Sequence, residues 1–463
     1  MKKQENSKKN ILFKEFPFWV MLVFLALLPF QAFLVTFIRF KFSLSSDQAV
    51  FISLWKEYFL AMLVILGILK TLRFKKLPFK ILKLDKIIFS FFVLAFLYFL
   101  FFGGNWGQKI SGLRYDLEFF LVYFLARTFN FDKRKIKIFL ITFLVTALLV
   151  VLFGLLQISY LPPSFLEKFG YTANPDLYLQ TGILSTYGPV NPSLPNFYRI
   201  QSTFPGALQF SSYLIVISAF VFSLTLFLRD KKQYFLLLIA FLLAVFLAIF
   251  ATYSRSAWLG LLAGIFTIFF IKAKKKRNVI LPTVILIFLG VVTAFLFFNV
   301  QTFQTIILHG EVRENALFGS TMTHFEAFLG SITLIFKNPL GMGIGSAGPA
   351  STLGRTLITE NWYFQIAIEL GILGLAIFSA IIIYLFNYLK RIFQESKEIL
   401  YKFLSLGLLG TLLGISVNSF LVHTWADTAT AYSFWLFAGL VIASFESNLS
   451  QEEPLKVFKN FLK

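Results

Sequence analysis

Long apolar runs follow one another along almost the whole chain and are separated by short polar segments. Since about 20 apolar residues suffice to cross a bilayer as a helix, the pattern predicts an all-α, polytopic transmembrane helix bundle with about twelve spans. The expected spans are Phe16–Phe37, Phe51–Leu69, Ile87–Phe102, Ser111–Phe129, Ile136–Leu156, Leu208–Leu228, Tyr234–Thr252, Ala257–Ile271, Ile280–Phe298, Trp362–Leu389, Phe403–Ser419 and Ala431–Ser444.

The fourth expected span differs from the others because Arg114, Asp116 and Glu118 interrupt it. Charged groups inside a bilayer are costly unless they face other polar groups. This span is therefore expected to lie against neighbouring helices rather than against lipid.

Composition agrees with a membrane environment. Hydrophobic residues make up 58% of the 463 residues, charged residues only 14%, and the mean hydropathy is +0.77. This leaves too little polar surface to coat a soluble globule. We treat residues 1–463 as one integral membrane domain, and the chain contains no cysteine, which excludes disulfides and thiolate chemistry.

The net charge of +21 does not indicate nucleic-acid binding, because the basic residues lie between the spans and not on an aromatic-rich folded face. If the N-terminus is cytoplasmic, 32 of the 43 Lys and Arg residues fall in cytoplasmic segments. The positive-inside rule therefore predicts that both termini are cytoplasmic. The apolar run after the N-terminal lysines lacks a small-residue cleavage site and is expected to be a retained first helix.

Two extracytoplasmic segments are much longer than the other connections: residues 159–207 and 301–361. Long loops in compact proteins are usually functional or disordered. The second includes an amphipathic helix candidate, Met322–Phe336, which is expected to lie along the membrane face. The cytoplasmic tail, residues 446–463, has a weak pattern of the same kind.

Two arginines lie at the outer ends of spans without acidic neighbours in sequence. Arg199 precedes the sixth span, and Arg255 lies in the short link between the seventh and eighth. A guanidinium can bind two oxygens of a diphosphate at once, so a lipid diphosphate would suit such a pair. The alternative is that both arginines reach lipid headgroups or cap helix ends; for the pair we hold the two interpretations about equal.

Candidates for acid–base chemistry also lie on the outer side. Glu360 and Asn361 stand where the second long loop enters the tenth span, and Glu360 could take a proton from an acceptor hydroxyl or simply favour the helix N-terminus. The histidines His309, His324 and His423 are too far apart in sequence for metal-ligand spacing, so no metal site is expected. Arg313 and Arg355 lie in a polar loop and are more typical of solvated residues.

Glu369 lies inside the tenth span and is followed by Gly371 and Gly374. An acidic residue in a span is either functional or paired with another polar group in the bundle. The sequence leaves these two interpretations equal. The glycine run at residues 341–345 does not follow a strand, which excludes a dinucleotide-binding loop and favours a turn.

Four stretches resemble, in this order, the motifs of the O-antigen ligase and polymerase superfamily. The resemblance covers roughly Tyr198 to Gly374. The stretches are Arg199 to Gly206, Ser254 to Gly260, Phe336 to Gly343, and Glu360 to Gln365 through Glu369 to Gly371.

The resemblance implies a metal-independent, inverting glycosyltransferase of the all-helical C-type, without a cofactor. Members move a glycan from an undecaprenyl diphosphate carrier to an acceptor outside the bacterial cytoplasmic (inner) membrane. By resemblance, Arg199 and Arg255 would hold the diphosphate and Glu360 would act as base, with Asn361, His324, Arg313 and Glu369 as further candidates. The ligases typically carry His-Asn where this chain has Glu360-Asn361.

Three functions remain open from the sequence, beside a structural or assembly role without chemistry, for which the outer arginines would be dispensable. The first is an O-antigen ligase-like transferase of lipopolysaccharide or another cell-envelope polysaccharide, with a glycan, lipid or protein acceptor. The second is a polymerase of the same superfamily. The third is a flippase or transporter, although no internal repeat is visible and the candidate charges gather at the outer surface and not at mid-bilayer.

Overall fold

The computed structural model describes residues 13, 15–75, 77–174, 181–189, 197–273, 320–353 and 359–461. These residues form helices and connecting turns, with two isolated β-bridges in the first long loop. The helices are α2 (Phe16–Leu27), η2 (Leu28–Phe30), α3 (Gln31–Lys41), α4 (Ser46–Ser53), α5 (Trp55–Phe74), α6 (Lys83–Phe101), α7 (Trp106–Phe129), α8 (Lys133–Ser159), α9 (Ser164–Glu167), α11 (Ala207–Leu228), α12 (Lys232–Ala251), α13 (Arg255–Lys272), α16 (Ser320–Lys337), η3 (Gly348–Leu353), α17 (Trp362–Glu395), α18 (Ile399–Asn418), η4 (Thr424–Ala426) and α19 (Thr428–Phe461).

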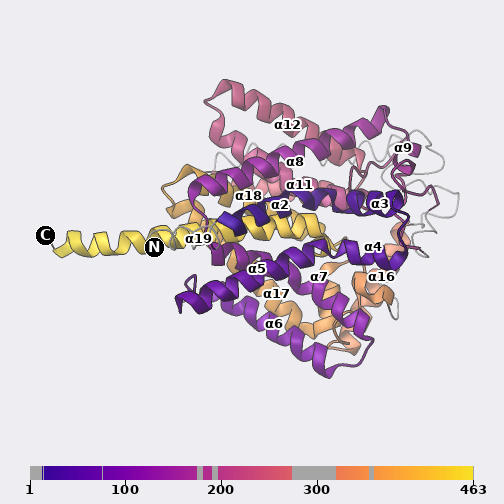
Figure 1. Cartoon of the computed structure of the whole chain (residues 1–463), viewed down its shortest axis with the longest axis horizontal. Helices are drawn as coiled ribbons and strands as arrows, with labels where there is room; N and C mark the ends of the chain where they lie inside the picture. Colours follow the sequence, from indigo (N-terminus) through magenta and orange to yellow (C-terminus); the bar gives the residue numbers. More distant parts are fainter. Residues whose placement is uncertain are drawn as a thin grey trace.

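The long helices run side by side in one bundle (Figure 1). Ten helices of the described residues are long and apolar enough to cross a membrane. They match the expected spans except the fourth and the ninth. The fourth is the charged helix α7, and the ninth, Ile280–Phe298, lies outside the described residues. The prediction of a polytopic helical membrane protein is therefore confirmed.

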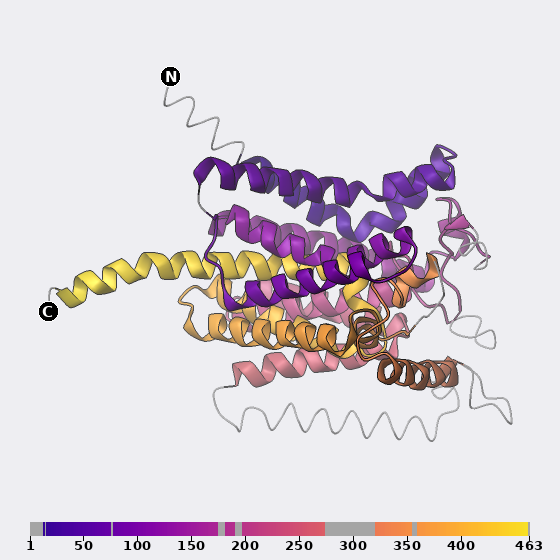
Figure 2. The same cartoon turned by 90° about the horizontal axis from the view of Figure 1, so that it is seen from below.

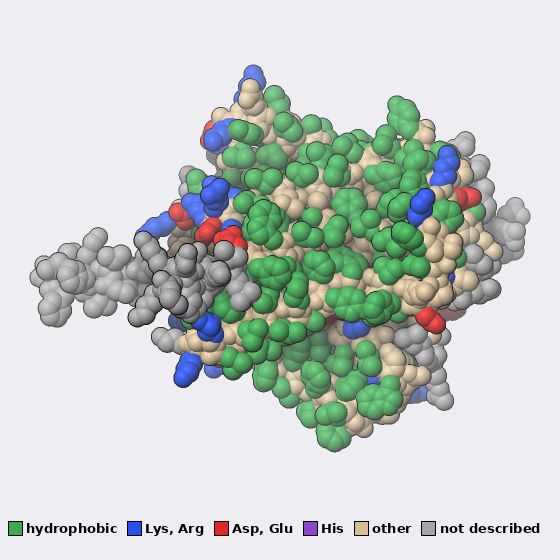
Figure 3. Space-filling view, in the orientation of Figure 1, with side chains coloured by type: hydrophobic (Ala, Val, Ile, Leu, Met, Phe, Trp, Pro, Cys, Tyr) green, Lys and Arg blue, Asp and Glu red, His purple; other side chains and the backbone are tan. Residues whose placement is uncertain are grey.

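The bundle has a clear centre and periphery. In the most apolar part of α19, 94% of residues are buried, and α18 and α11 follow with 78% and 72%. Only 22% are buried in α12 and in the α4–α5 span, whose side chains therefore face outward. Hydrophobic side chains cover the flank of the bundle, whereas many Lys and Arg side chains lie at the end from which α19 projects (Figure 3).

Two pairs of glycines bring α13 and α18 close together. Gly260 on α13 faces Gly414 on α18, and Gly264 faces Gly410. On each helix the two glycines are four positions apart. A methyl group on Gly264 would lie only 2.8 Å from the carbonyl oxygen of Gly410. This is the small-residue packing by which membrane helices approach closely, and it fixes the helix that begins at Arg255.

Helix α17 is broken at Gly371, and the preceding glycine-rich turn fills the break. Gly371 has φ 71° and ψ −176°, which interrupts the helical hydrogen bonding. The amides of Met342 and Gly343 donate to the carbonyls of Ile368 and Glu369, at 2.7 and 3.1 Å. The amide of Ile372 donates in turn to Pro339 at 3.0 Å. Non-helical backbone is tolerated at membrane depth only when its polar groups are satisfied in this way.

The expected amphipathic helix is present as α16. It packs against the start of α17, where the rings of Phe328 and Phe364 have centroids 5.0 Å apart. Figure 2 shows α16 at the end of the bundle opposite the projecting part of α19. It thus lies beside the segment that carries Glu360 and Asn361.

Candidate functional site

Arg199 is held at the C-terminal end of α12. Its amide donates to the carbonyl of Gly188 at 2.9 Å, and its Nε donates to the carbonyl of Thr252 at 3.2 Å. The next residue, Ile200, donates its amide to Ala251 at 3.2 Å. The side chain of Arg199 therefore lies on the turn that joins α12 to α13.

Arg255 stands on the same turn, at the first residue of α13. Tyr253, two residues earlier, has φ 52°, and Ser254 precedes the helix in an extended conformation. The close packing of Gly260 and Gly264 on α18 fixes the direction in which this helix start points. Arg255 thus adds its charge to a helix N-terminus, which already favours anions.

The two arginines influence each other electrostatically. Burial lowers the pKa of Arg199 from its ordinary value, and the positive charge of Arg255 lowers it further. A guanidinium nevertheless stays protonated in proteins. Within the described residues no ion pair joins a carboxylate to Arg199, and Arg255 lies on the same α12–α13 turn. Binding an anion there would relieve their repulsion.

Glu360 and Asn361 lie at the start of α17. Glu360 has φ 51°, and Asn361 is the N-cap, whose Oδ1 accepts the amide of Phe364 at 3.1 Å. The Nδ2 of Asn361 is buried and has no partner among the described residues. Asn361 therefore has a structural role through its oxygen, while its nitrogen remains available to a ligand.

His423, from the turn between α18 and α19, contacts this segment. Its Nε2 lies 3.3 Å from Oγ1 of Thr359, and that hydroxyl donates to the carbonyl of Asn361 at 3.1 Å. Because the hydroxyl proton is used in this way, the histidine nitrogen is the donor to Thr359. Burial lowers the pKa of His423 to about 4, and the charge of Glu360 counteracts this by raising it. His423 is thus neutral at pH 7.

The end of α18 connects the arginine turn with the start of α17. The amide of Trp362 donates to the carbonyl of Ser419 at 3.0 Å. The neighbouring Asn418 packs close to Gly260 of α13 and donates to Ser212 of α11 at 2.9 Å. The segment that carries Glu360 and the helix that begins at Arg255 therefore contact the same end of α18.

Glu369 has the contacts of a structural residue. It is fully buried, and its carboxylate oxygens accept the amides of Gly345 and Ala347 at 2.9 and 3.2 Å. Asp116 of α7 lies beside it and accepts a hydrogen bond from Gln365 at 3.1 Å. Glu369 thus holds the glycine-rich turn in the break of α17.

The other two charges of the fourth span, Arg114 and Glu118, have partners on α5. Arg114 pairs with Glu57, while Lys56 lies 3.2 Å from Glu57 and 3.6 Å from Glu118. Neither Lys56 nor Glu57 was predicted as a partner of these charges. Their position within the second apolar run was the signal that could have identified them.

Several candidates cannot be placed. Arg313, His309 and Arg355 lie outside the described residues, and for His324 only the helix is described, not the side chain. Among the described residues no cluster of His, Asp and Glu could hold a metal ion.

Comparison with known proteins gives two matches. Residues 240–379 match the family model described as O-Antigen ligase. The chain is also similar to an O-antigen polymerase of Salmonella muenchen, with 29% identity over 192 residues. That match covers 40% of this chain and 46% of the relative, so the chain spans about half the length of the relative. Arg255, Glu360, Asn361 and Glu369 lie within the family match, and Arg199 lies before it.

Proposed function

We propose that this chain, which belongs to the O-antigen ligase and polymerase superfamily, transfers a glycan from an undecaprenyl diphosphate carrier to an acceptor hydroxyl. The reaction takes place on the outer face of the bacterial cytoplasmic membrane, in the synthesis of a cell-surface polysaccharide. Both termini lie in the cytoplasm. The family match and the helical bundle support this proposal.

The observation that carries the proposal is the pair of arginines on the α12–α13 turn. Burial lowers the pKa of Arg199, and the positive charge of Arg255 lowers it further. Two guanidinium groups that share one site match the charge and the oxygen geometry of a diphosphate. Their place at a helix N-terminus adds further N–H dipoles for the same anion.

The proposed chemistry is an inverting displacement at the anomeric carbon. The acceptor oxygen forms the new glycosidic bond while the bond to the carrier diphosphate breaks, and the released diphosphate keeps the electron pair. Arg199 and Arg255 stabilise the negative charge that develops on this leaving group. Glu360 takes the proton of the acceptor hydroxyl, and no metal ion is needed because the arginines supply the positive charge.

Glu360 stands where the ligases carry the histidine that is their proposed base. A carboxylate can accept the same proton, so the exchange is compatible with transfer. Asn361 completes the segment, with its buried Nδ2 as a donor toward substrate.

The second candidate function is a polymerase, and the name of the Salmonella muenchen relative favours it. A ligase and a polymerase release the same carrier diphosphate but differ in the acceptor. The ligase transfers the glycan to a lipid, glycan or protein, whereas the polymerase extends a second carrier-linked glycan.

The test is a reconstitution with purified protein, an undecaprenyl diphosphate glycan and a panel of acceptors. We expect the parent to release carrier diphosphate and to form a product with one acceptor class. A ladder of longer carrier-linked glycans would favour the polymerase. Movement of the intact donor across the membrane without release of diphosphate would contradict transfer and favour a flippase.

A further inference from the structure

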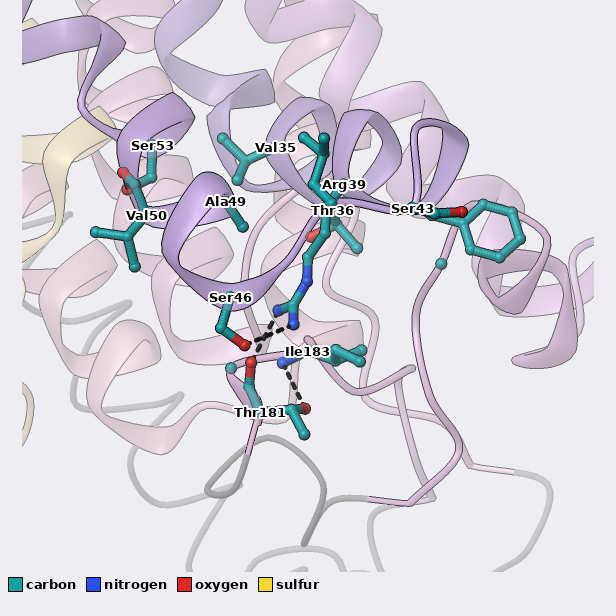
Figure 4. Close-up of a pocket in the computed structure, with 14 residues that line it drawn as sticks. Val35, Thr36, Arg39, Ser43, Ser46, Ala49, Val50, Ser53, Thr181 and Ile183 are labelled. Carbon is teal, nitrogen blue, oxygen red and sulfur yellow. Dashed lines mark hydrogen bonds between the residues drawn. The ribbon is translucent and has the colours of Figure 1, made fainter.

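A second polar site lies at the outer surface, away from the arginine turn. A cavity of about 540 Å³ opens between α3, α4 and the first long loop, where residues 170 and 181–183 line it (Figure 4). Neither Arg199, Arg255 nor Glu360 is among its lining residues. The cavity is therefore distinct from the proposed transfer site.

Arg39 gives this cavity its charge. Its Nη1 donates to the carbonyl of Thr181 at 2.8 Å, and its Nη2 donates to Oγ of Ser46 at 3.1 Å (Figure 4). A guanidinium has five N–H donors, so these two bonds fix its orientation and leave donors for a ligand. None of the fourteen lining residues is acidic. Five of them carry hydroxyl groups and two are glycines: Thr36, Ser43, Ser46, Ser53, Thr181, Gly170 and Gly182.

The position of the cavity points to a lipid. Arg39 lies in the last turn of α3, at the outer end of the first membrane span. Large apolar side chains are exposed around it: Phe40 is 54% exposed, Phe42 69% and Val50 60%. An arginine at the outer end of a span lies at the level of the lipid headgroups. The exposed apolar side chains beside it suit acyl chains.

We propose that this cavity binds the phosphate-bearing headgroup of an outer-leaflet lipid. The guanidinium of Arg39 binds the phosphate oxygens, the hydroxyl groups of Ser43 and Ser46 hydrogen-bond the remaining headgroup oxygens, and the acyl chains run along Phe40 and Val50. A phosphodiester has one negative charge, which the single arginine matches.

The site is coupled through the backbone to the segment that holds Arg199. Ile183 lines the cavity, and Gly188 accepts the amide of Arg199 at 2.9 Å. Gly188 is five positions after Ile183 in the sequence, so the backbone at Gly188 lies within about 18 Å of Ile183. A lipid bound in the cavity would therefore contact the same loop that accepts the amide of Arg199.

The experiment measures retained lipid by native mass spectrometry. The purified full chain is taken from phosphatidylcholine nanodiscs that contain a minor fraction of phosphatidylglycerol. We expect Arg39→Ala to retain about tenfold less phosphatidylglycerol than the parent, as the loss of a charge-assisted contact implies. Lys41→Ala is the matched control, because Lys41 ends the same helix but does not line the cavity. Equal retention by the parent and Arg39→Ala, or an equal loss in Lys41→Ala, would overturn the proposal.

A second measurement separates lipid from free phosphate. Phosphatidylglycerol should raise the melting temperature of the parent but not of Arg39→Ala, and inorganic phosphate at the same concentration should not. An Arg39-dependent rise with inorganic phosphate alone would refute a lipid occupant. If Arg39→Ala does not fold, Val50→Trp provides the test, because it adds bulk at the cavity wall. This variant should retain less phosphatidylglycerol than the parent, and full retention would refute the site. Lipid retention is measured without donor or acceptor, so its outcome is independent of whether transfer occurs.

Discussion

Glu360 is the residue that most sharply separates this chain from the ligase pattern. If it acts as the base, Glu360→Gln should lower the transfer rate by about 10²- to 10³-fold, because general-base catalysis contributes that order of magnitude. Glu360→His should retain much of the activity, since a histidine at this position can accept the same proton. The measurement is initial-rate release of carrier diphosphate.

A control with the same change in charge keeps this experiment interpretable. Glu326→Gln removes a carboxylate from α16, which packs beside the start of α17. This substitution should leave the transfer rate unchanged. A Glu360→Gln protein as active as the parent would assign Glu360 only a helix-terminal role.

His423 should make stability depend on pH. Its pKa is about 4 in the folded chain against about 6.5 when exposed, so the unfolded state binds the proton more tightly between these values. Stability from this group is complete above pH 6.5 and is lost as the pH falls toward 4, by up to about 1.4 kcal/mol per pH unit.

Asp427 changes the stability in the opposite direction to His423 as the pH falls. Burial raises its pKa to about 6, so the folded chain gains stability as the pH falls from 6 toward 4. Comparing the parent with His423→Asn isolates the histidine. We expect the melting temperature of His423→Asn to fall less between pH 6.5 and pH 4.5 than that of the parent. Parallel pH profiles would contradict the assignment.

At the residue scale, the charged residues of the candidate site could be predicted from the sequence, but the residues that contact them could not. Arg199 and Arg255 were identified because arginines at the outer ends of spans are few. The link between His423 and Thr359 could not be predicted, because it joins residues 64 positions apart through a turn geometry that hydropathy does not encode. The sequence could not decide whether Glu369 is functional or is paired with another polar group in the bundle. The structure shows that its carboxylate accepts the amides of Gly345 and Ala347, which are more than 20 positions away.

At the scale of elements, the break in α17 is the feature most sensitive to a single change. Gly371→Ala would force a side chain into a left-handed conformation and place its Cβ 2.7 Å from the carbonyl oxygen of Pro339. We expect a loss of at least about 2 kcal/mol, seen as a lower melting temperature in detergent. Gly330→Ala is the control, because a Cβ there meets nothing within 4 Å. Equal stability of the two variants would show that the break is not needed for folding.

The spans themselves could be predicted because their hydrophobic runs are long and uninterrupted. What hydropathy could not show was how they pack. The paired glycines at 260, 264, 410 and 414 are visible in the sequence as two GxxxG motifs, but only the structure shows that they face each other. The sequence predicted a turn at residues 341–345. It could not show that this turn fills the break in α17, because the turn is held there by hydrogen bonds to residues further along the chain.

At the scale of the whole molecule, helix α2 begins and α19 ends at the same end of the bundle (Figure 1). Together with the distribution of Lys and Arg, this supports a cytoplasmic location for both termini. The chain has no cysteine, so single cysteines can report the topology without background. A membrane-impermeant maleimide should label Lys168→Cys in intact cells and should label Lys231→Cys only after the membrane is opened. The reverse pattern would invert the topology and place the arginine turn in the cytoplasm.

The central claim is that Arg199 and Arg255 together bind a diphosphate, and a direct measurement is the affinity for a short-chain isoprenyl diphosphate. We expect Arg199→Gln and Arg255→Gln each to weaken binding by about 10- to 100-fold, and the monophosphate to bind the parent much more weakly than the diphosphate. Arg229→Gln, a substitution of an exposed arginine at the other end of α11, should bind like the parent. Unchanged affinity in both Arg199→Gln and Arg255→Gln would contradict the claim.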